Sequence, residues 1–184
     1  NRLRNKSSLM MIVLFLTLVI FPIAISNQYL LYIMVLIFMW TIPAIGWNIL
    51  AGYTGQISLG HAAFFGIGAY AGAIMYATYA DVPHFNLSPF LILPLAGLIA
   101  AGASIIIGIP CFRLRGPFFL LATIAFNEVI KVIAIQWIDV TNGSIGLSMK
   151  PIPPVILFGQ TFFDFTSNTS YYYLALALMA LALA

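Results

Sequence analysis

The 184-residue chain is strongly apolar: 63% of its residues are hydrophobic, 6% are charged, and its mean hydropathy is +1.09. Soluble globular domains carry about 25% charged residues, which cover their surface. The composition therefore excludes a soluble enzyme, a disordered tail and a nucleic-acid-binding protein. The net charge of +3 comes from basic residues that are spread along the chain and do not form a basic patch.

Apolar stretches that are long enough to cross a bilayer recur along the chain. One helical crossing needs about 20 apolar residues. The expected spans, of which the last is too short to cross, are 9–25, 29–50, 62–80, 89–109, 117–137 and 171–184. The sequence thus predicts an all-α fold, a polytopic transmembrane helical bundle of about six spans that is truncated in its last span. We expect residues 1–184 to form a single transmembrane domain.

The basic residues predict the orientation of these spans, because loops on the cytoplasmic side are enriched in Lys and Arg. With a cytoplasmic N-terminus, residues 51–61 and 110–116 lie inside, and residues 81–88 and 139–170 lie outside. The basic residues that are then cytoplasmic are Arg2, Arg4, Lys6, Arg113 and Arg115. We expect a multi-pass protein of the cell membrane.

The stretch between the second and third spans combines glycines with polar side chains. Its candidate site residues are Gly52, Tyr53, Thr54, Gly55, Gln56, Ser58, Gly60 and His61. A glycine inside a helix costs about 1 kcal/mol relative to alanine, so a simple helix is disfavoured here. A broken segment presents free backbone N–H and C=O groups, which transporters use to hold polar solutes. The stretch is therefore either part of a solute path or an ordinary cytoplasmic turn.

The fifth expected span carries polar groups inside the membrane. Glu128 and Lys131 stand at i, i+3 and share a helix face. Ionisable groups in a span are costly, so they pair or point inward. The two residues form either a structural ion pair or part of a solute path or proton relay. For Asn127 we expect a hydrogen bond between helices.

Two short motifs have simpler interpretations. Gly68 and Gly72, four residues apart in an apolar span, predict close packing against another helix. Arg113 and Arg115 form a basic turn between two spans, which either anchors the topology or contacts a cytoplasmic partner. The single cysteine, Cys111, is expected to be a small apolar filler.

The sequence contains no pattern for covalent or metal chemistry. It has no Ser/His/Asp arrangement, no nucleophile elbow and no phosphate-binding loop. His61 has no second histidine or carboxylate nearby in the sequence, which disfavours a metal site. Without a Walker motif the chain cannot hydrolyse ATP by that route. We expect no catalytic residue, no metal and no cofactor in this chain.

Three stretches, in the same order, resemble one family. Residues 46–70 (GWNILAGYTGQISLGHAAFFGIGAY) strongly resemble the signature of LivM-type permeases, the membrane subunits of branched-chain amino-acid ABC importers. Residues 113–128 (RLRGPFFLLATIAFNE) resemble the second signature of that family. Residues 141–147 (TNGSIGL), with the prolines that follow, resemble its next outer loop. Together the resemblance covers more than half of the chain.

The resemblance implies a transport subunit of the inner membrane, not an enzyme. Such a permease domain forms the translocation pathway for branched-chain amino acids. It pairs with a homologous second permease, two cytoplasmic ATPase subunits that use ATP, and an extracytoplasmic solute-binding protein. Residues 52–61 would lie near the pathway and make weak, brief contacts with a zwitterion. The loop that docks the ATPase lies in the C-terminal half of the family's chains, so Arg113 and Arg115 are secondary candidates for that contact.

Two alternatives stay open. Related permeases for urea and short amides share much of the signature, so the substrate is less certain than the class. An ion-coupled secondary transporter would instead use Glu128 as its coupling carboxylate and would need no ATPase. A membrane-embedded enzyme is disfavoured, because no reactive constellation is present.

Overall fold

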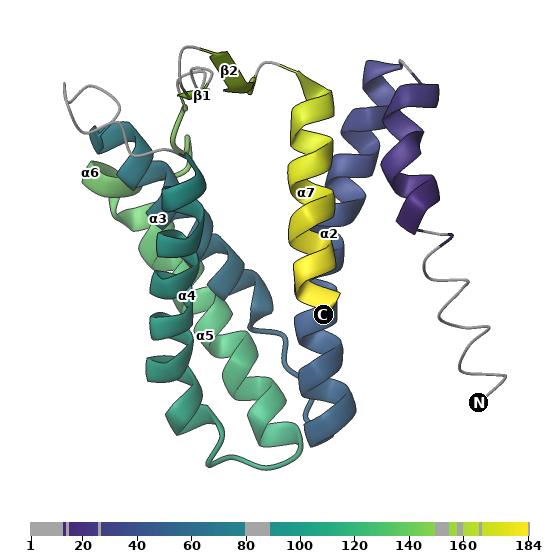
Figure 1. The fold of residues 1–184 in the computed structure, drawn as a ribbon. Helices are drawn as coiled ribbons and strands as arrows, with labels where there is room; N and C mark the ends of the chain where they lie inside the picture. The colour runs from purple at the N-terminus through teal and green to yellow at the C-terminus, as the bar shows by residue number, and fades with distance from the viewer. Residues whose placement is uncertain are drawn as a thin grey trace, which may run out of the picture. The chain divides into compact units, whose positions relative to one another are not determined.

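The computed structural model describes residues 13, 15–25, 27–79, 89–149, 155–157, 160–165 and 167–183. Helices account for most of them (Figure 1). In chain order they are Phe15–Ala24, α2 (Gln28–Thr54), α3 (His61–Tyr79), α4 (Pro89–Cys111), α5 (Pro117–Gln136), the single turn α6 (Ile138–Thr141) and α7 (Asn168–Leu183). Before α7, the strands β1 (Val155–Leu157) and β2 (Gln160–Phe163) pair in an antiparallel hairpin, with Leu157 opposite Gln160.

The helices confirm the predicted all-α membrane bundle. Among the described residues, α2, α4 and α5 are long and apolar enough to cross a membrane. The helix Phe15–Ala24 and α7 are shorter apolar helices, and α3 has 19 residues. The hairpin is a small addition within the link that we expected at residues 139–170. The predicted outer loop at 81–88 and the basic residues Arg2, Arg4 and Lys6 lie outside the described residues.

Two predicted boundaries are wrong. The sixth span was expected to begin at residue 171, but α7 begins at Asn168. The second span was expected to end at residue 50, but α2 continues to Thr54. Gly52 is therefore helical, and the hydroxyl of Thr54 donates to the carbonyl of Leu50 at 2.6 Å. Extending an existing helix adds one backbone hydrogen bond per residue, which offsets the cost of a single glycine.

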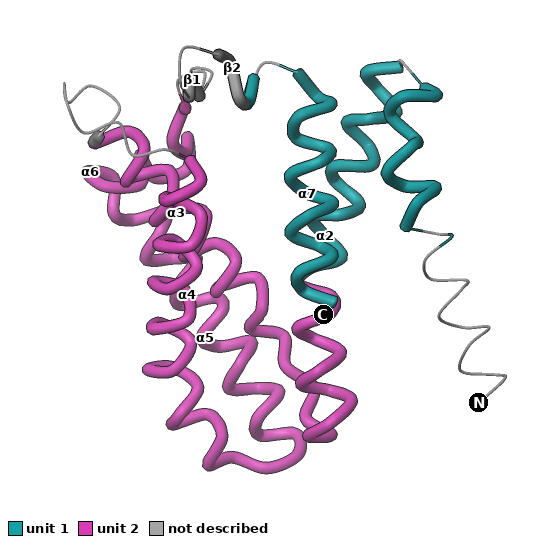
Figure 2. The backbone as a smooth tube through the Cα atoms, viewed as in Figure 1, with its two compact units in different colours: residues 1–42, 151–184 teal, residues 43–150 magenta. Residues whose placement is uncertain are grey.

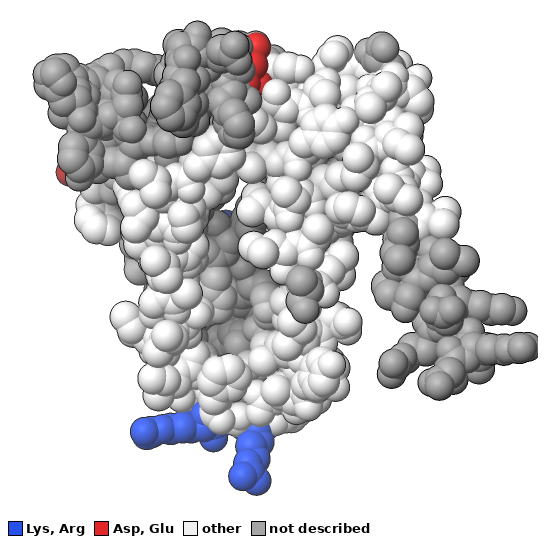
Figure 3. Space-filling view, in the orientation of Figure 1, with Lys and Arg blue, Asp and Glu red and all other residues white. Residues whose placement is uncertain are grey.

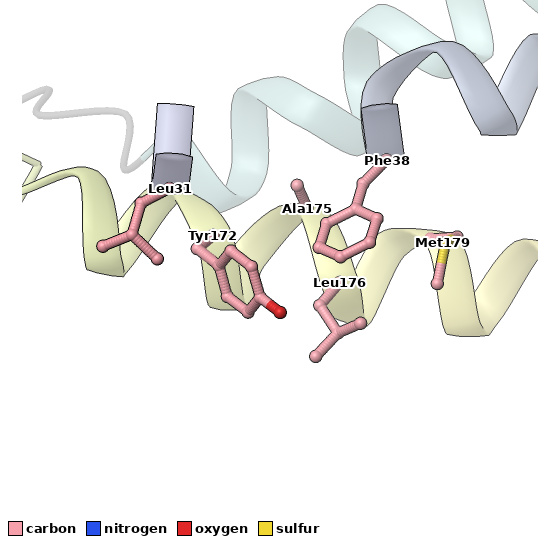
Figure 4. Close-up of a cluster of buried hydrophobic side chains, with 6 residues drawn as sticks. All are labelled: Leu31, Phe38, Tyr172, Ala175, Leu176 and Met179. Atoms are coloured by element: carbon pink, nitrogen blue, oxygen red, sulfur yellow. The ribbon is translucent and has the colours of Figure 1, made fainter. Parts of the chain in front are cut away.

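The chain divides into two compact units, residues 1–42 with 151–184, and residues 43–150 (Figure 2). In the first unit, buried side chains of α2 and α7 form an apolar cluster (Figure 4). Tyr172 is fully buried in it, packs edge-on against Phe38, and donates its hydroxyl to the carbonyl of Leu18 at 2.6 Å. The members of the cluster are Leu31, Phe38, Tyr172, Ala175, Leu176 and Met179.

The second unit packs α3, α4 and α5 together, and the tightest contact joins α3 to α4. A Cβ atom on Gly68 would meet the Cβ of Ala100 at 3.4 Å, and one on Gly72 would meet the Cβ of Ala96 at 3.5 Å. The two glycines thus lie directly against small residues of the neighbouring helix, which confirms the predicted close packing.

The sharp turn between α4 and α5 has a simple cause. Gly116 has φ +58°, a conformation that favours glycine, and Pro117 starts α5 where no backbone N–H is needed. The two helices therefore run in opposite directions, and Thr123 in the first half of α5 meets the segment that joins α2 to α3.

Candidate functional site

The connector Gly55–Gly60 joins α2 to α3 without regular secondary structure. It leaves the helix through Gly55, whose φ of +66° suits glycine. Two of its residues are buried, Ser58 at 4% exposed and Gly60, whereas Ile57 and Leu59 are 53% and 50% exposed. A break in the helix at this place is what the glycine and polar pattern predicted, although it begins three residues later.

Three hydrogen bonds hold the connector. The indole Nε1 of Trp47 donates to the carbonyl of Ser58 at 2.8 Å, which ties the connector to α2. The backbone N–H of Leu59 donates to Oγ1 of Thr123 at 3.2 Å, which ties it to α5. Within the connector, the N–H of Gly60 donates to Oγ of Ser58 at 3.2 Å. Each bond satisfies a backbone group that no helix satisfies, which stabilises the irregular segment.

The connector lies directly against α5 at Gly60. A Cβ atom on Gly60 would lie 3.5 Å from the Cβ of Thr123. Thr123 is itself 7% exposed, and its hydroxyl donates to the carbonyl of Leu120 at 2.9 Å. The threonine therefore uses its oxygen both as a donor within α5 and as an acceptor for the connector.

Sequence reasoning missed Trp47 and Thr123 as parts of the site. Both residues lie inside the two stretches that carry the family resemblance, and that was the available signal. Their partners are 11 and 64 residues away in the chain, so no local pattern identifies them.

A cavity of about 330 Å³ lies beside the connector, within the unit of residues 43–150. Its walls come from α3, α4, α5, the end of α2 and the connector, and most of the wall is apolar. The lining residues are Leu50, Ser58, Gly60, His61, Ala63, Phe64, Ser104, Ile107, Gly108, Cys111, Phe112, Phe119, Thr123, Phe126, Asn127 and Ile130. Cys111 is 2% exposed and serves as one of these small wall residues, as its apolar-filler interpretation predicts.

The structure brings together part of the predicted site. Ser58, Gly60 and His61 line the cavity from the connector side, and Asn127 lines it from α5. His61 is half-buried, and its Nδ1 is buried without a hydrogen bond in the described part of the chain. Gln56 is half-buried and does not line the cavity. Its Oε1 is likewise buried without a hydrogen bond in the described part of the chain.

The other predicted residues at the start of this stretch do not reach the cavity. Gly52, Tyr53 and Thr54 lie in the last turn of α2 and are exposed, Tyr53 at 89%. Gly55 is exposed as well. None of the four lines the cavity.

Glu128 and Lys131 form an ion pair on the surface of α5. The Nζ of Lys131 lies 3.2 Å from Oε2 of Glu128, and the side chains are 61% and 57% exposed, respectively. Neither residue lines the cavity, although Asn127 beside them does. The geometry is that of the structural ion pair, one of the two interpretations that the sequence left open.

Basic side chains occupy the end of the second unit where α4 turns into α5 (Figure 3). Arg113 and Arg115 are exposed there. Asp139 follows the opposite end of α5, in α6. In the described ranges, no group of three or more His, Cys, Asp or Glu side chains could hold a metal ion.

Comparison with known proteins identifies the family of this chain. Residues 29–184 match the family described as branched-chain amino acid transport system / permease component. The chain belongs to this family. The match covers the connector, the cavity and the whole of the second unit, so the resemblance of residues 46–70 and 113–128 to LivM-type permeases is confirmed. The apolar helices are accordingly those of a membrane protein.

Two curated relatives carry the name high-affinity branched-chain amino acid transport system permease protein LivM. The protein of Escherichia coli (strain K12) is 32% identical over 157 residues, which cover 85% of this chain and 35% of the relative. That of Salmonella typhimurium (strain LT2) is 34% identical over 123 residues, which cover 67% of this chain and 27% of the relative. The chain thus spans about a third of the length of these relatives. No solved structure matches it.

Proposed function

We propose that this chain is part of the membrane-spanning permease subunit of an ATP-driven importer for branched-chain amino acids, and that the connector Gly55–Gly60 lies on the translocation pathway. The observation that carries the proposal is the irregular connector, whose buried residues Ser58 and Gly60 line a cavity, in a chain of the branched-chain permease family. Irregular backbone at membrane depth occurs where protein or a solute cavity satisfies it.

The proposal extends to partners and placement. The subunit would pair with a homologous second permease, two cytoplasmic ATPase subunits and an extracytoplasmic solute-binding protein in the inner membrane. The chain would contain no ATPase site, because work comes from the ATPase subunits. Its N-terminus would be cytoplasmic, on the side of Arg113 and Arg115, which places these exposed arginines where they can contact a partner.

The ion-coupled alternative finds less support in the geometry. A coupling carboxylate should face the solute path, but Glu128 lies outside the cavity lining and is paired with Lys131. Of Asn127, Glu128 and Lys131, the first lines the cavity, where it can contact the cargo, and the other two do not.

Uptake of labelled leucine tests the proposal in cells that lack their own system and carry the complete operon. We expect uptake, measured per amount of subunit in the membrane, to depend on the ATPase subunits, to stop with vanadate, and to persist in the Glu128→Gln variant. Uptake that is insensitive to vanadate and is abolished by Glu128→Gln would instead support ion coupling. Uptake of urea or short amides in place of leucine would leave the importer class in place and change the substrate.

A further inference from the structure

We propose that the cavity beside the connector receives the aliphatic side chain of the transported amino acid, so that the permease itself discriminates among cargoes by the size of that side chain. The inference rests on the proposed function and adds a specificity site to it. It assigns the apolar wall of the cavity, and not the connector alone, to recognition of the cargo.

The chemistry of the wall favours an apolar occupant. Phe64 of α3, Ile107 of α4 and Phe126 of α5 supply apolar surface from three helices. A site that is mostly apolar, with a few polar groups at one side, is the usual form of a small-molecule pocket. The polar groups here come from the connector with His61, from Ser104 of α4, and from Thr123 and Asn127 of α5.

The hydroxyl groups of the wall are already engaged within the protein. Oγ of Ser58 accepts from the N–H of Gly60. Oγ of Ser104 donates to the carbonyl of Ala101 at 2.8 Å. Oγ1 of Thr123 both donates to Leu120 and accepts from Leu59. These hydroxyls offer little to a polar side chain of a cargo, which would lose water and depend on His61 and Asn127 for partners, whereas an aliphatic side chain needs none.

The size of the cavity is suited to such a role. About 330 Å³ lies at the lower end of the range for small-ligand sites. In an apolar pocket, one methylene group more or less in the ligand changes the relative rate for the two ligands about 10- to 200-fold. Brief occupation of an apolar pocket also allows release, because no strong polar bond must break.

The side chain of Ile107 offers a direct test with a matched control. Ile107 lines the cavity, while the adjacent Ile106 on α4 is 75% exposed and outside the lining. Phenylalanine at position 107 adds volume inside the cavity, and alanine removes it. The same substitutions at position 106 change the outer surface of α4 only.

The complete importer is reconstituted in proteoliposomes, and maximal uptake rates are measured with binding protein saturated by leucine or by valine. Saturation removes the binding protein's own preference from the ratio of the rates. We expect Ile107→Phe to lower the leucine-to-valine ratio about tenfold. We expect Ile107→Ala to raise the uptake of the longer norleucine relative to leucine. Both Ile106 variants should leave the ratios within twofold of wild type.

The outcomes separate this inference from the proposed function. Unchanged ratios in both Ile107 variants would overturn the inference, as would equal shifts at Ile106 and Ile107. If Ile107→Phe does not accumulate in the membrane, the alanine variant and Ile130→Ala on the α5 wall decide the matter. A wild-type importer that transports no branched-chain amino acid would refute the proposed function itself.

Discussion

At the scale of single residues, Thr123 has the most demanding position at the site. Its one hydroxyl oxygen accepts from a backbone N–H of the connector and donates to a carbonyl of its own helix. The residue is nearly buried, so water cannot replace either bond. An unpaired buried polar group costs about 1–3 kcal/mol. The connector's place beside the cavity should depend on this side chain.

Replacing Thr123 by valine tests that dependence. Valine keeps the shape but leaves the N–H of Leu59 unpaired, so we expect a loss of about 1–3 kcal/mol in the free energy of unfolding and a lower uptake rate. Thr123→Ser keeps the oxygen and should stay near wild type in both. The measurements are thermal unfolding of the purified subunit in detergent and leucine uptake in proteoliposomes. Equal behaviour of the valine and serine variants would contradict a role for the hydroxyl.

At the scale of elements, the packing of α3 on α4 positions one wall of the cavity. It depends on Gly72, whose added Cβ would touch Ala96 and Ile92 of α4 at 3.5 and 3.7 Å. Gly66 on the same helix has open space where a Cβ would be. Van der Waals packing and small residues, not a hydrophobic driving force, hold helices together in lipid.

We therefore expect Gly72→Leu to separate α3 from α4 and to lower the amount of folded subunit several-fold. Gly66→Leu adds the same side chain to the same helix without that contact and should be tolerated. Quantitative blotting of membrane fractions, followed by fluorescence-detected gel filtration, compares the two variants. A tolerated leucine at position 72 would show that the approach of the two helices is not tight.

The Glu128–Lys131 pair also acts at the level of an element, because it lies on the exposed side of a helix apolar enough to cross a membrane. An unpaired charge in a span costs more than a paired one. We expect Lys131→Met alone to reduce the amount of subunit in the membrane, and Glu128→Gln combined with Lys131→Met to restore it. Blotting of the two variants beside the wild type measures this. If the amount of the double variant in the membrane stays low, the two charges have a role other than pairing with each other.

At the scale of the whole molecule, the distribution of basic residues predicts which side of the membrane each turn occupies. Arg113 and Arg115 stand at the start of α5, and Asp139 follows its end. Excess Lys and Arg mark the cytoplasmic side. The α4–α5 turn should therefore be cytoplasmic, and the turn after α6 should face outward.

Cysteine labelling checks that orientation. The chain has a single cysteine, so a Cys111→Ala background carries no thiol in this part of the protein. We expect the Leu114→Cys variant to react with a membrane-impermeant maleimide only in inside-out vesicles, and Ser144→Cys only in intact cells. The reverse pattern would invert the proposed orientation and place the arginines outside.

Local patterns in the sequence determined the class of protein, most of its helices and its family. Hydropathy and the length of apolar runs act along the chain, so α4 and α5 appear within two residues of their predicted bounds. Short motifs also predicted the contact of Gly68 and Gly72 with another helix. The predicted end of α2 was four residues too early, because the backbone hydrogen bonds gained by extending the helix outweigh the cost of Gly52.

Only the tertiary structure decided which polar residues share a site. Of the stretch from Gly52 to His61, three residues line the cavity, and the exposed Tyr53 does not. The bond from Leu59 to Thr123 joins residues 64 positions apart. Such a contact depends on how α5 packs beside the connector, and no periodicity within either segment encodes that distance. Hydropathy places helices in a membrane, but it is the packing of their small and polar side chains that brings a site together.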